Sequence, residues 1–243
     1  MKHKFLIKPI FFAFSVFLKF FSHRYSSITK LDKWTTVKDV LTDALLTSLW
    51  KSPREIVGVR FGSKTQHCLL DIDIGSIYHP NNSDRLPELL GCLEEAGFTP
   101  YIPIQSSRSE GLHIYFVFSE QLPTFKVASL LATTLKDAGF PLMKGELEIF
   151  LNTKTFVATN DLSKYTKYNG HHLPLQEVSF VLDENYEPCS NSLEYFIACC
   201  NWCAKGIDID EIKENLSNKK KSGTKTIIRQ NIRFKSGNKI LQE

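Results

Sequence analysis

The sequence predicts a protein of the α/β (α+β) class, with a core whose strands and helices follow one another in the order βαββαβ. Short apolar runs alternate along the chain with longer stretches that have hydrophobic residues at helical spacing. Both helical stretches end at a glycine, Gly97 or Gly139, as helices commonly do. The 243 residues are 42% hydrophobic and 23% charged, which is the composition of an ordinary globular protein with a sizeable core.

Six core elements follow from these patterns. In chain order they are expected at 69–74, 84–96, 101–106, 111–118, 124–138 and 146–151. This order is the split βαβ arrangement of ferredoxin-like and RRM-like folds. In such folds the sheet order is 4-1-3-2, so the first strand of the core lies between the third and the fourth. Both helices cover one face of the sheet and leave the other face open.

The first strand of the core carries two acidic residues in an otherwise apolar run. Because side chains alternate between the two faces of a strand, Asp71 and Asp73 share one face. Two ionised carboxylates on an apolar strand repel each other and are unfavourable unless they are paired or bind a metal. A divalent cation would remove both penalties.

Two further strands carry ionisable residues on the face that the helices leave open, namely His113 on the third strand and Glu146 and Glu148 on the fourth. Each feature alone has an ordinary explanation. An Asp-x-Asp often lies in a turn, a single histidine usually makes a structural hydrogen bond, and a glutamate often solvates a sheet edge. Because three strands bring such groups to one face, we expect a shared metal or phosphate site formed by Asp71, Asp73, His113 and Glu148.

The segments that carry these residues resemble the archaeo-eukaryotic primase (primase-polymerase) superfamily, in particular the type found on bacterial and cyanobacterial plasmids and mobile elements. The matching segments occur in family order and are LLDIDIGSIYHP at 69–80, SSRSEGLHIYF at 106–116, GELEIFLNTK at 145–154 and YNGHHLPLQ at 168–176. Position by position, the resemblance implies a metal-binding triad of Asp71, Asp73 and Glu148. It also implies that Ser109 and His113 grip the triphosphate of the incoming nucleotide.

The residue chemistry agrees with that implication. In nucleotidyl transfer, two cations about 3.5–4 Å apart stabilise the attacking and the leaving oxygen. Mg²⁺ and Mn²⁺ prefer carboxylate ligands and complete their coordination with water and phosphate oxygens, so a two-metal site is expected here. The loop between the second and third strands offers hydroxyls, backbone amides and a glycine suited to phosphate. The expected phosphate-binding residues are Ser107, Arg108, Ser109, Gly111 and His113, with Lys154, His171 and His172 as further candidates.

The function expected from this resemblance is that of a DNA primase/polymerase-like nucleotidyltransferase. It would carry out divalent-metal-dependent, template-directed nucleotide transfer in the replication of a plasmid or mobile element. Expected partners are a nucleic acid template, nucleoside triphosphates and a replicative helicase. Two alternatives stay open: a metal-dependent nuclease that uses the same carboxylates, and a non-catalytic or decayed primase fragment that binds nucleic acid.

Three regions are expected along the chain. Residues 1–56 would form a small N-terminal α/β portion with a helical segment that includes a helix over 36–50. Residues 57–188 would form the primase-polymerase core, and residues 189–243 a helical, basic extension. The net charge is only +4, but the last 25 residues are rich in lysine and arginine. Such a run attracts a phosphate backbone, although it is also typical of a solvated tail. The candidate nucleic-acid-binding residues there are Lys219, Lys220, Lys221, Arg229 and Arg233.

Cellular location is expected to be cytoplasmic, without stable membrane association. The apolar run at 10–18 is short for a membrane span, is interrupted by flanking lysines, and is not followed by a cleavage signal, so a buried helix is favoured. The six cysteines do not suggest a disulfide framework. Cys200 and Cys203 form a single Cys-x-x-Cys in a helical pattern, which is weak evidence for zinc.

Overall fold

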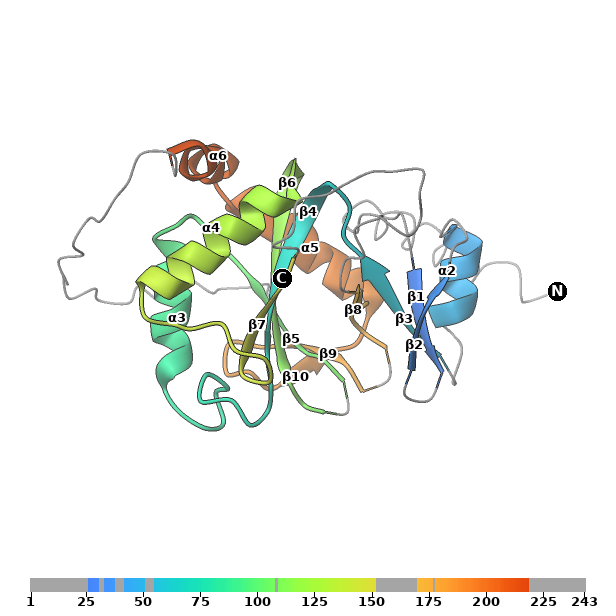
Figure 1. The fold of residues 1–243 in the computed structure, drawn as a ribbon. Coiled ribbons are helices and arrows are strands. Elements are labelled where there is room, and N and C mark those ends of the chain that lie inside the picture. The colour runs from blue at the N-terminus through green and yellow to red at the C-terminus, as the bar shows by residue number, and fades with distance from the viewer. Residues whose placement is uncertain are drawn as a thin grey trace.

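The computed structural model describes residues 26–30, 33–37, 42–50, 55–107, 109–151, 170–176 and 178–218 of the chain. These residues form two antiparallel sheets and five helices (Figure 1). The strands are β1 (Ser26–Lys30), β2 (Lys33–Val37), β3 (Glu55–Arg60), β4 (Lys64–Ile72), β5 (Ile102–Gln105), β6 (Leu112–Pro123), β7 (Leu147–Phe150), β8 (Gly170–His172), β9 (Phe180–Leu182) and β10 (Pro188–Ser190). The helices are α2 (Asp43–Trp50), α3 (Arg85–Glu94), α4 (Thr124–Asp137), α5 (Leu193–Gly206) and α6 (Ile209–Asn218).

The larger sheet has six strands in the order β10-β9-β5-β6-β4-β7. Its last four strands correspond to the four strands expected in the core, and β4 lies between β6 and β7 as the order 4-1-3-2 requires. All neighbouring strands in this sheet run antiparallel. The two short strands β9 and β10 extend the β5 edge and were not expected from the sequence.

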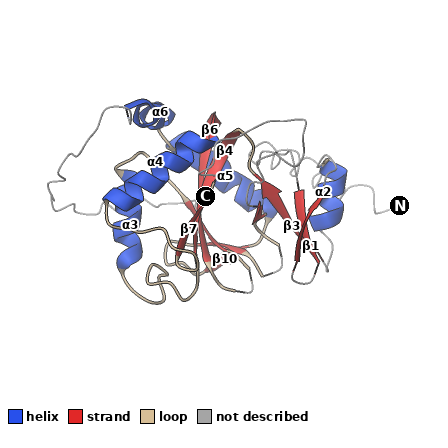
Figure 2. Cartoon of the chain, in the orientation of Figure 1, coloured by secondary structure: helices blue, strands red, loops and turns tan. Residues whose placement is uncertain are grey.

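One face of the large sheet is covered by α4, which lies across β4, β6 and β7, and α3 packs beside α4 (Figures 1 and 2). Both helices bury their apolar residues, among them Leu89 and Leu93 of α3 and Leu131 and Leu135 of α4. The edge of the Phe98 ring meets Phe116 of β6 on the same side of the sheet. The expected helices are therefore present, and both lie on one side.

The opposite face, which we expected to be open, is partly covered by α5. Phe196 of α5 meets Tyr115 of β6 edge to face with ring centroids 6.2 Å apart, and neither side chain is exposed. The amide of Val117 donates to the thiol of Cys203, also on α5. The sequence of β6 explains this coverage, because its residues from Ile114 to Phe118 are all apolar, as in strands that are buried on both faces.

The smaller sheet has the order β2-β1-β3-β8, and α2 packs against β3. The strands at 26–30 and 33–37, together with α2, agree with the expected small α/β portion, but they show that residues 1–56 are not a helical segment throughout. The expected helix over 36–50 begins only at Asp43. The physical reason is the β-branched composition of SSITK and KWTTV, in runs too short to show a clear period. The apolar residues 10–18 lie outside the described part of the chain.

The chain returns from the large sheet to the small one after β7. The next strand, β8, pairs with β3 of the small sheet and not with a strand of the large sheet. Gln176 secures this connection, since its amide nitrogen donates to the carbonyl of Val57 and its amide oxygen accepts from the Val57 amide. Between the sheets, Nε2 of His67 on β4 lies 3.2 Å from Nε2 of His171 on β8. The Phe61 ring stacks on His171 with centroids 4.8 Å apart.

The six cysteines are free thiols, as the sequence predicts. Within the described ranges, no three or more His, Cys, Asp or Glu side chains form a group that could hold a metal ion. No helix in these ranges is both long and apolar enough to cross a bilayer.

Substitution of Phe196 tests the packing of α5 on the large sheet. Phe196→Ala is expected to lower the free energy of unfolding by about 3–5 kcal/mol, because it removes a buried ring and leaves a cavity against Tyr115. Denaturant titration measures the effect. Trp202 of the same helix has 36% of its surface exposed, so Trp202→Ala is the matched control, with an expected loss of about 1 kcal/mol or less. Equal effects of the two substitutions would contradict the burial of this helix face.

Candidate active site

The site is built on the register of three adjacent strands. Asp71 of β4 lies directly opposite His113 of β6 and directly opposite Glu148 of β7. Residues that are opposite each other in antiparallel strands project from the same face, so these three side chains share the face that α4 does not cover. Nε2 of His113 lies 3.2 Å from Oδ1 of Asp71, and the histidine is buried. The structure thus brings together three residues that the sequence pattern placed on one face.

Asp73 lies just beyond the end of β4 and is exposed. Partial burial raises the pKa of its carboxyl group above the usual range, and the negative charges of Asp71 and Glu146 raise the pKa further. The turn at Gly145 approaches closely, since a Cβ at Gly145 would lie 3.6 Å from Oδ2 of Asp73. Asp71, Asp73 and Glu146 therefore form an acidic group at this end of β4.

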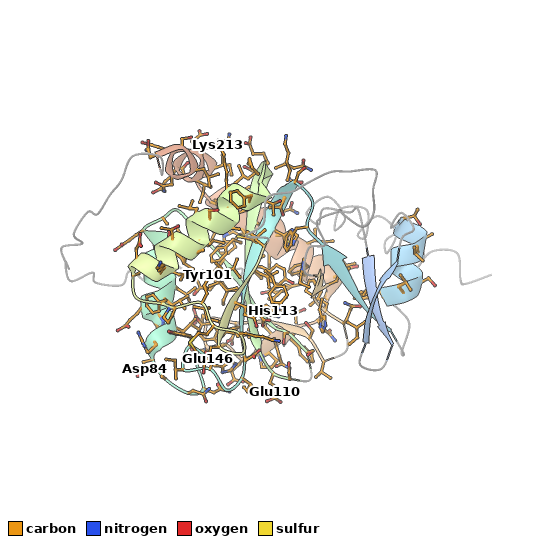
Figure 3. The ribbon with its side chains drawn as sticks, viewed as in Figure 1. Asp84, Tyr101, Glu110, His113, Glu146 and Lys213 are labelled. Atoms are coloured by element: carbon orange, nitrogen blue, oxygen red, sulfur yellow. The ribbon has the colours of Figure 1, made fainter. Side chains whose placement is uncertain are left out.

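Glu146 lies close enough to Asp73 to affect its pKa, and the sequence pattern placed it on the open face although it was not among the candidate site residues. It raises the pKa of Asp73, whereas Oε1 of Glu148 accepts a hydrogen bond from the Gly145 amide. The alternation of acidic and apolar residues in 146–151 was the available signal, and it does not distinguish the two glutamates. In Figure 3, Glu146 lies with Glu110 near one end of the large sheet, and Lys213 of α6 lies at the other end.

The donor chemistry of the site suits a hard divalent cation. Asp71 and Asp73 supply carboxylate oxygens, and the raised pKa of Asp73 reflects in part a repulsion that a cation would relieve. In the described residues, Asp71, Asp73 and Glu148 are not arranged as a three-residue group that could hold a metal ion. Asp71 is engaged by His113 and Glu148 by Gly145. Mg²⁺ is commonly held by one or two carboxylates together with water and substrate phosphates, so Asp71 and Asp73 fit that requirement.

Residues 106–107 and 109–111 belong to a turn that we call the serine loop. Oγ of Ser109 lies 3.3 Å from Oγ of Ser106 and 3.2 Å from Oγ of Ser107. The Ser106 amide donates to the carbonyl of Gly111 and closes the loop. A Cβ at Gly111 would lie 3.2 Å from the Ser106 hydroxyl and 3.3 Å from the Ile72 carbonyl, so glycine allows the loop to approach the end of β4 closely. Arg108 lies outside the described residues.

The two histidines of β8 have different surroundings. His172 has its pKa lowered to about 4, by burial and then by the nearby His113, so it carries no charge at neutral pH. His171 faces the interior between the sheets, where it contacts His67 and Phe61. Burial lowers the pKa of His171 well below the usual range.

His171 is therefore a core residue in this structure, which differs from its expected role at a phosphate. The reason is the two-residue alternation of a strand, which turns one member of an adjacent pair inward. Two sets of candidates lie outside the described residues. These are Lys154 and the basic residues Lys219, Lys220, Lys221, Arg229 and Arg233.

Among the solved structures that match, the chain is similar to the AEP domain of the primase-polymerase of cyanophage S-2L, with 14% sequence identity, a TM-score of 0.38 and coverage of 78% of this chain and 96% of that domain. It is also similar to primase RepB′, with 11% identity, a TM-score of 0.36 and coverage of 87% of this chain and 67% of that one.

A third similar structure is the catalytic domain of primase RepB′ in complex with initiator DNA. It has 10% identity and a TM-score of 0.38, and the match covers 84% of this chain and 97% of that domain. No protein-family model and no curated protein matches the chain.

The buried histidines make the stability of the fold depend on pH. The folded-state pKa values of His171 and His172 are lowered, so between the ordinary histidine value of about 6.5 and the folded-state values the unfolded chain binds more protons. The contribution of these two histidines to the free energy of unfolding is therefore expected to be constant above about pH 6.5 and to fall as the pH drops toward about 4. Denaturant titrations at a series of pH values measure this slope.

The raised pKa of Asp73 acts in the opposite direction at acidic pH, so the titrations are best made in an Asp73→Asn background. His172→Asn in that background is expected to flatten the slope between about pH 6 and about pH 4. An unchanged slope would show that His172 titrates normally in the folded protein.

Proposed function

We propose that this chain is a divalent-metal-dependent nucleotidyltransferase of the primase/polymerase type, acting on a nucleic acid template in the replication of a plasmid or mobile element. The observation that carries the proposal is the register of β4 with β6 and β7. It aligns Asp71 with His113 and Glu148 on one face and leaves Asp73 at the end of the strand. The serine loop, which joins β5 to β6, ends beside the same end of β4.

The residues divide into two groups by their chemistry. Asp71 and Asp73 would hold the divalent cation, which in nucleotidyl transfer stabilises the negative charge on the attacking and leaving oxygens. The hydroxyls of Ser106, Ser107 and Ser109 converge in the serine loop and can donate hydrogen bonds to phosphate oxygens. His113 is oriented by its contact with Asp71 and would donate to the triphosphate.

A sheet-face interaction with single-stranded RNA is less well supported by the geometry. Such recognition needs exposed aromatic rings on the sheet on which bases can stack. Tyr115 has no exposed surface, because α5 covers it. The Tyr115 ring is therefore not available as a stacking platform.

An extension assay separates the candidate functions. Protein is incubated with a template, labelled ribo- or deoxynucleoside triphosphates, and Mn²⁺ or Mg²⁺. Products longer than the input are expected. Products shorter than the input would identify a nuclease, and an unchanged template that is nevertheless bound would identify a binding module without catalysis.

Asp71→Asn and Asp73→Asn are each expected to lower nucleotide incorporation by at least about 100-fold, because each removes a metal-ligand charge. The thermal midpoint of the metal-free protein should hold or rise, since the repulsion that raises the pKa of Asp73 is relieved. Mn²⁺ should raise the midpoint of the wild type more than that of either variant. Template affinity is measured in parallel and should be nearly unchanged.

Asp84 provides the matched control for these two substitutions. It is exposed at the N-terminus of α3, and its side chain makes no capping hydrogen bond. Asp84→Asn should leave incorporation and stability near wild-type values. Wild-type incorporation in Asp71→Asn or Asp73→Asn would contradict the metal-binding role.

His113→Ala is expected to raise the apparent KM for the nucleotide about tenfold or more, because a hydrogen bond to a charged group contributes about 1.5–3 kcal/mol. Its effect on template affinity should be smaller. Steady-state kinetics with varied nucleotide, together with a template-binding titration, give the two values. A variant with a normal nucleotide KM and weaker template binding would place His113 at the nucleic acid instead.

A further inference from the structure

The connection between β4 and α3, residues 73–84, is folded by its own hydrogen bonds. The Ser76 amide donates to the carbonyl of Asp73 at 2.9 Å. Nδ2 of Asn82 donates to the carbonyl of Ile74 at 2.6 Å and to that of Ser76 at 2.8 Å. This connection starts at the acidic group and has a defined shape without a regular helix or strand.

The same connection contacts the segments on both sides of the site. Nε2 of His79 lies 3.1 Å from the carbonyl oxygen of Glu110 in the serine loop. The Ile77 amide donates to Oε2 of Glu146 at 3.2 Å, in the turn that precedes β7. Figure 3 shows Glu110 and Glu146 at the same end of the molecule.

The hydrogen bonds of His79 define its tautomer. The Asn81 amide donates to Nδ1 at 3.3 Å, so Nδ1 is the acceptor and the ring proton is on Nε2, where it is donated to Glu110. His79 is buried, with 5% of its surface exposed. Burial also lowers its pKa, so the ring stays neutral and keeps this donor at neutral pH.

The hydrogen bond from His79 is made to Glu110, a residue of the serine loop whose backbone conformation is strained. Glu110 has a φ of +56°, in the left-handed region that residues other than glycine rarely adopt. Its amide donates to the carbonyl of Ser107 at 3.0 Å, and this turn brings the Ser107 and Ser109 hydroxyls together. A strained backbone conformation persists only where its surroundings hold it.

We propose that His79 is a positioning residue. The hydrogen bond from its Nε2–H to the carbonyl of Glu110 holds the serine loop in the strained conformation that brings the serine hydroxyls together. Through this bond the segment that starts at Asp73 sets the position of the serine loop. Loss of the bond allows Glu110 to leave the left-handed region, and the loop then opens. The consequence for nucleotide binding rests on the proposed function, whereas the consequence for the loop does not.

Amide hydrogen exchange tests the positioning role without any assay of activity. The amides of Ser106 and Glu110 donate within the loop, and both are expected to exchange at least about tenfold faster in His79→Ala than in the wild type. In His79→Gln the side-chain amide supplies a donor near the position of Nε2, so exchange should return toward the wild-type rate. Unchanged exchange at Glu110 in a folded His79→Ala variant would overturn the proposal.

A second substitution separates positioning from a general packing role of the buried ring. Glu110→Gly removes the strain, because glycine adopts a positive φ readily. If His79 acts by holding Glu110, His79→Ala should accelerate exchange at Ser106 much less in the Glu110→Gly background than in the wild type. Equal acceleration in both backgrounds would show that His79 is only a core residue, and the proposal would fail.

Nucleotide binding gives the functional readout. With deoxyadenosine triphosphate and Mn²⁺ as the probe, His79→Ala should raise the Kd or KM about tenfold with a much smaller change in kcat, and His79→Gln should partly restore it. A wild type that binds no triphosphate, together with the expected exchange pattern, would refute the proposed function and leave the positioning role intact. A normal Kd in His79→Ala despite faster loop exchange would overturn the link between the loop and the nucleotide.

Discussion

The pairing register of β4 is the constraint on which the candidate site depends. Asp71 has one neighbour directly opposite it on each side, His113 on β6 and Glu148 on β7. The adjacent residues Leu70 and Ile72 have no exposed surface and face the helix layer. A slip of one residue would exchange these two sets, with Asp71 turned toward α4 and apolar side chains turned toward the site. Burial of the apolar set therefore determines where the acidic residue lies.

Coverage of the sheet limits the site to one end of it. On the face that bears Asp71, α5 packs over Tyr115, so the middle of β6 is closed on both sides. Polar residues gather where β4 leaves the sheet and where the serine loop and the Gly145 turn approach it. Charged groups there need less desolvation than they would in the centre of the sheet.

The order of strands and helices along the chain was enough to predict the order of the central strands, because that order is typical of the split βαβ arrangement. The side-chain period of two in a strand was enough to predict the shared face of Asp71, His113 and Glu148. It could not predict that α5 covers part of that face, since the partner of an apolar helix is not encoded in its own pattern. Nor could it tell Glu146 from Glu148, or show that His171 packs inward beside His67. Those outcomes depend on turns and on contacts between segments far apart in the sequence.

The small sheet depends on a strand from much later in the chain. β3 ends at Arg60, and its partner β8 begins at Gly170, so more than a hundred residues separate the two. During synthesis from the N-terminus, β1, β2 and β3 can pair as soon as they emerge, but the free edge of β3 stays open until most of the core has been made. Pairing of β8 with that edge joins residues far apart in the sequence, and such contacts form late and slowly in folding. A ribosome-bound chain that stops before residue 170 would expose that edge to pairing with other chains.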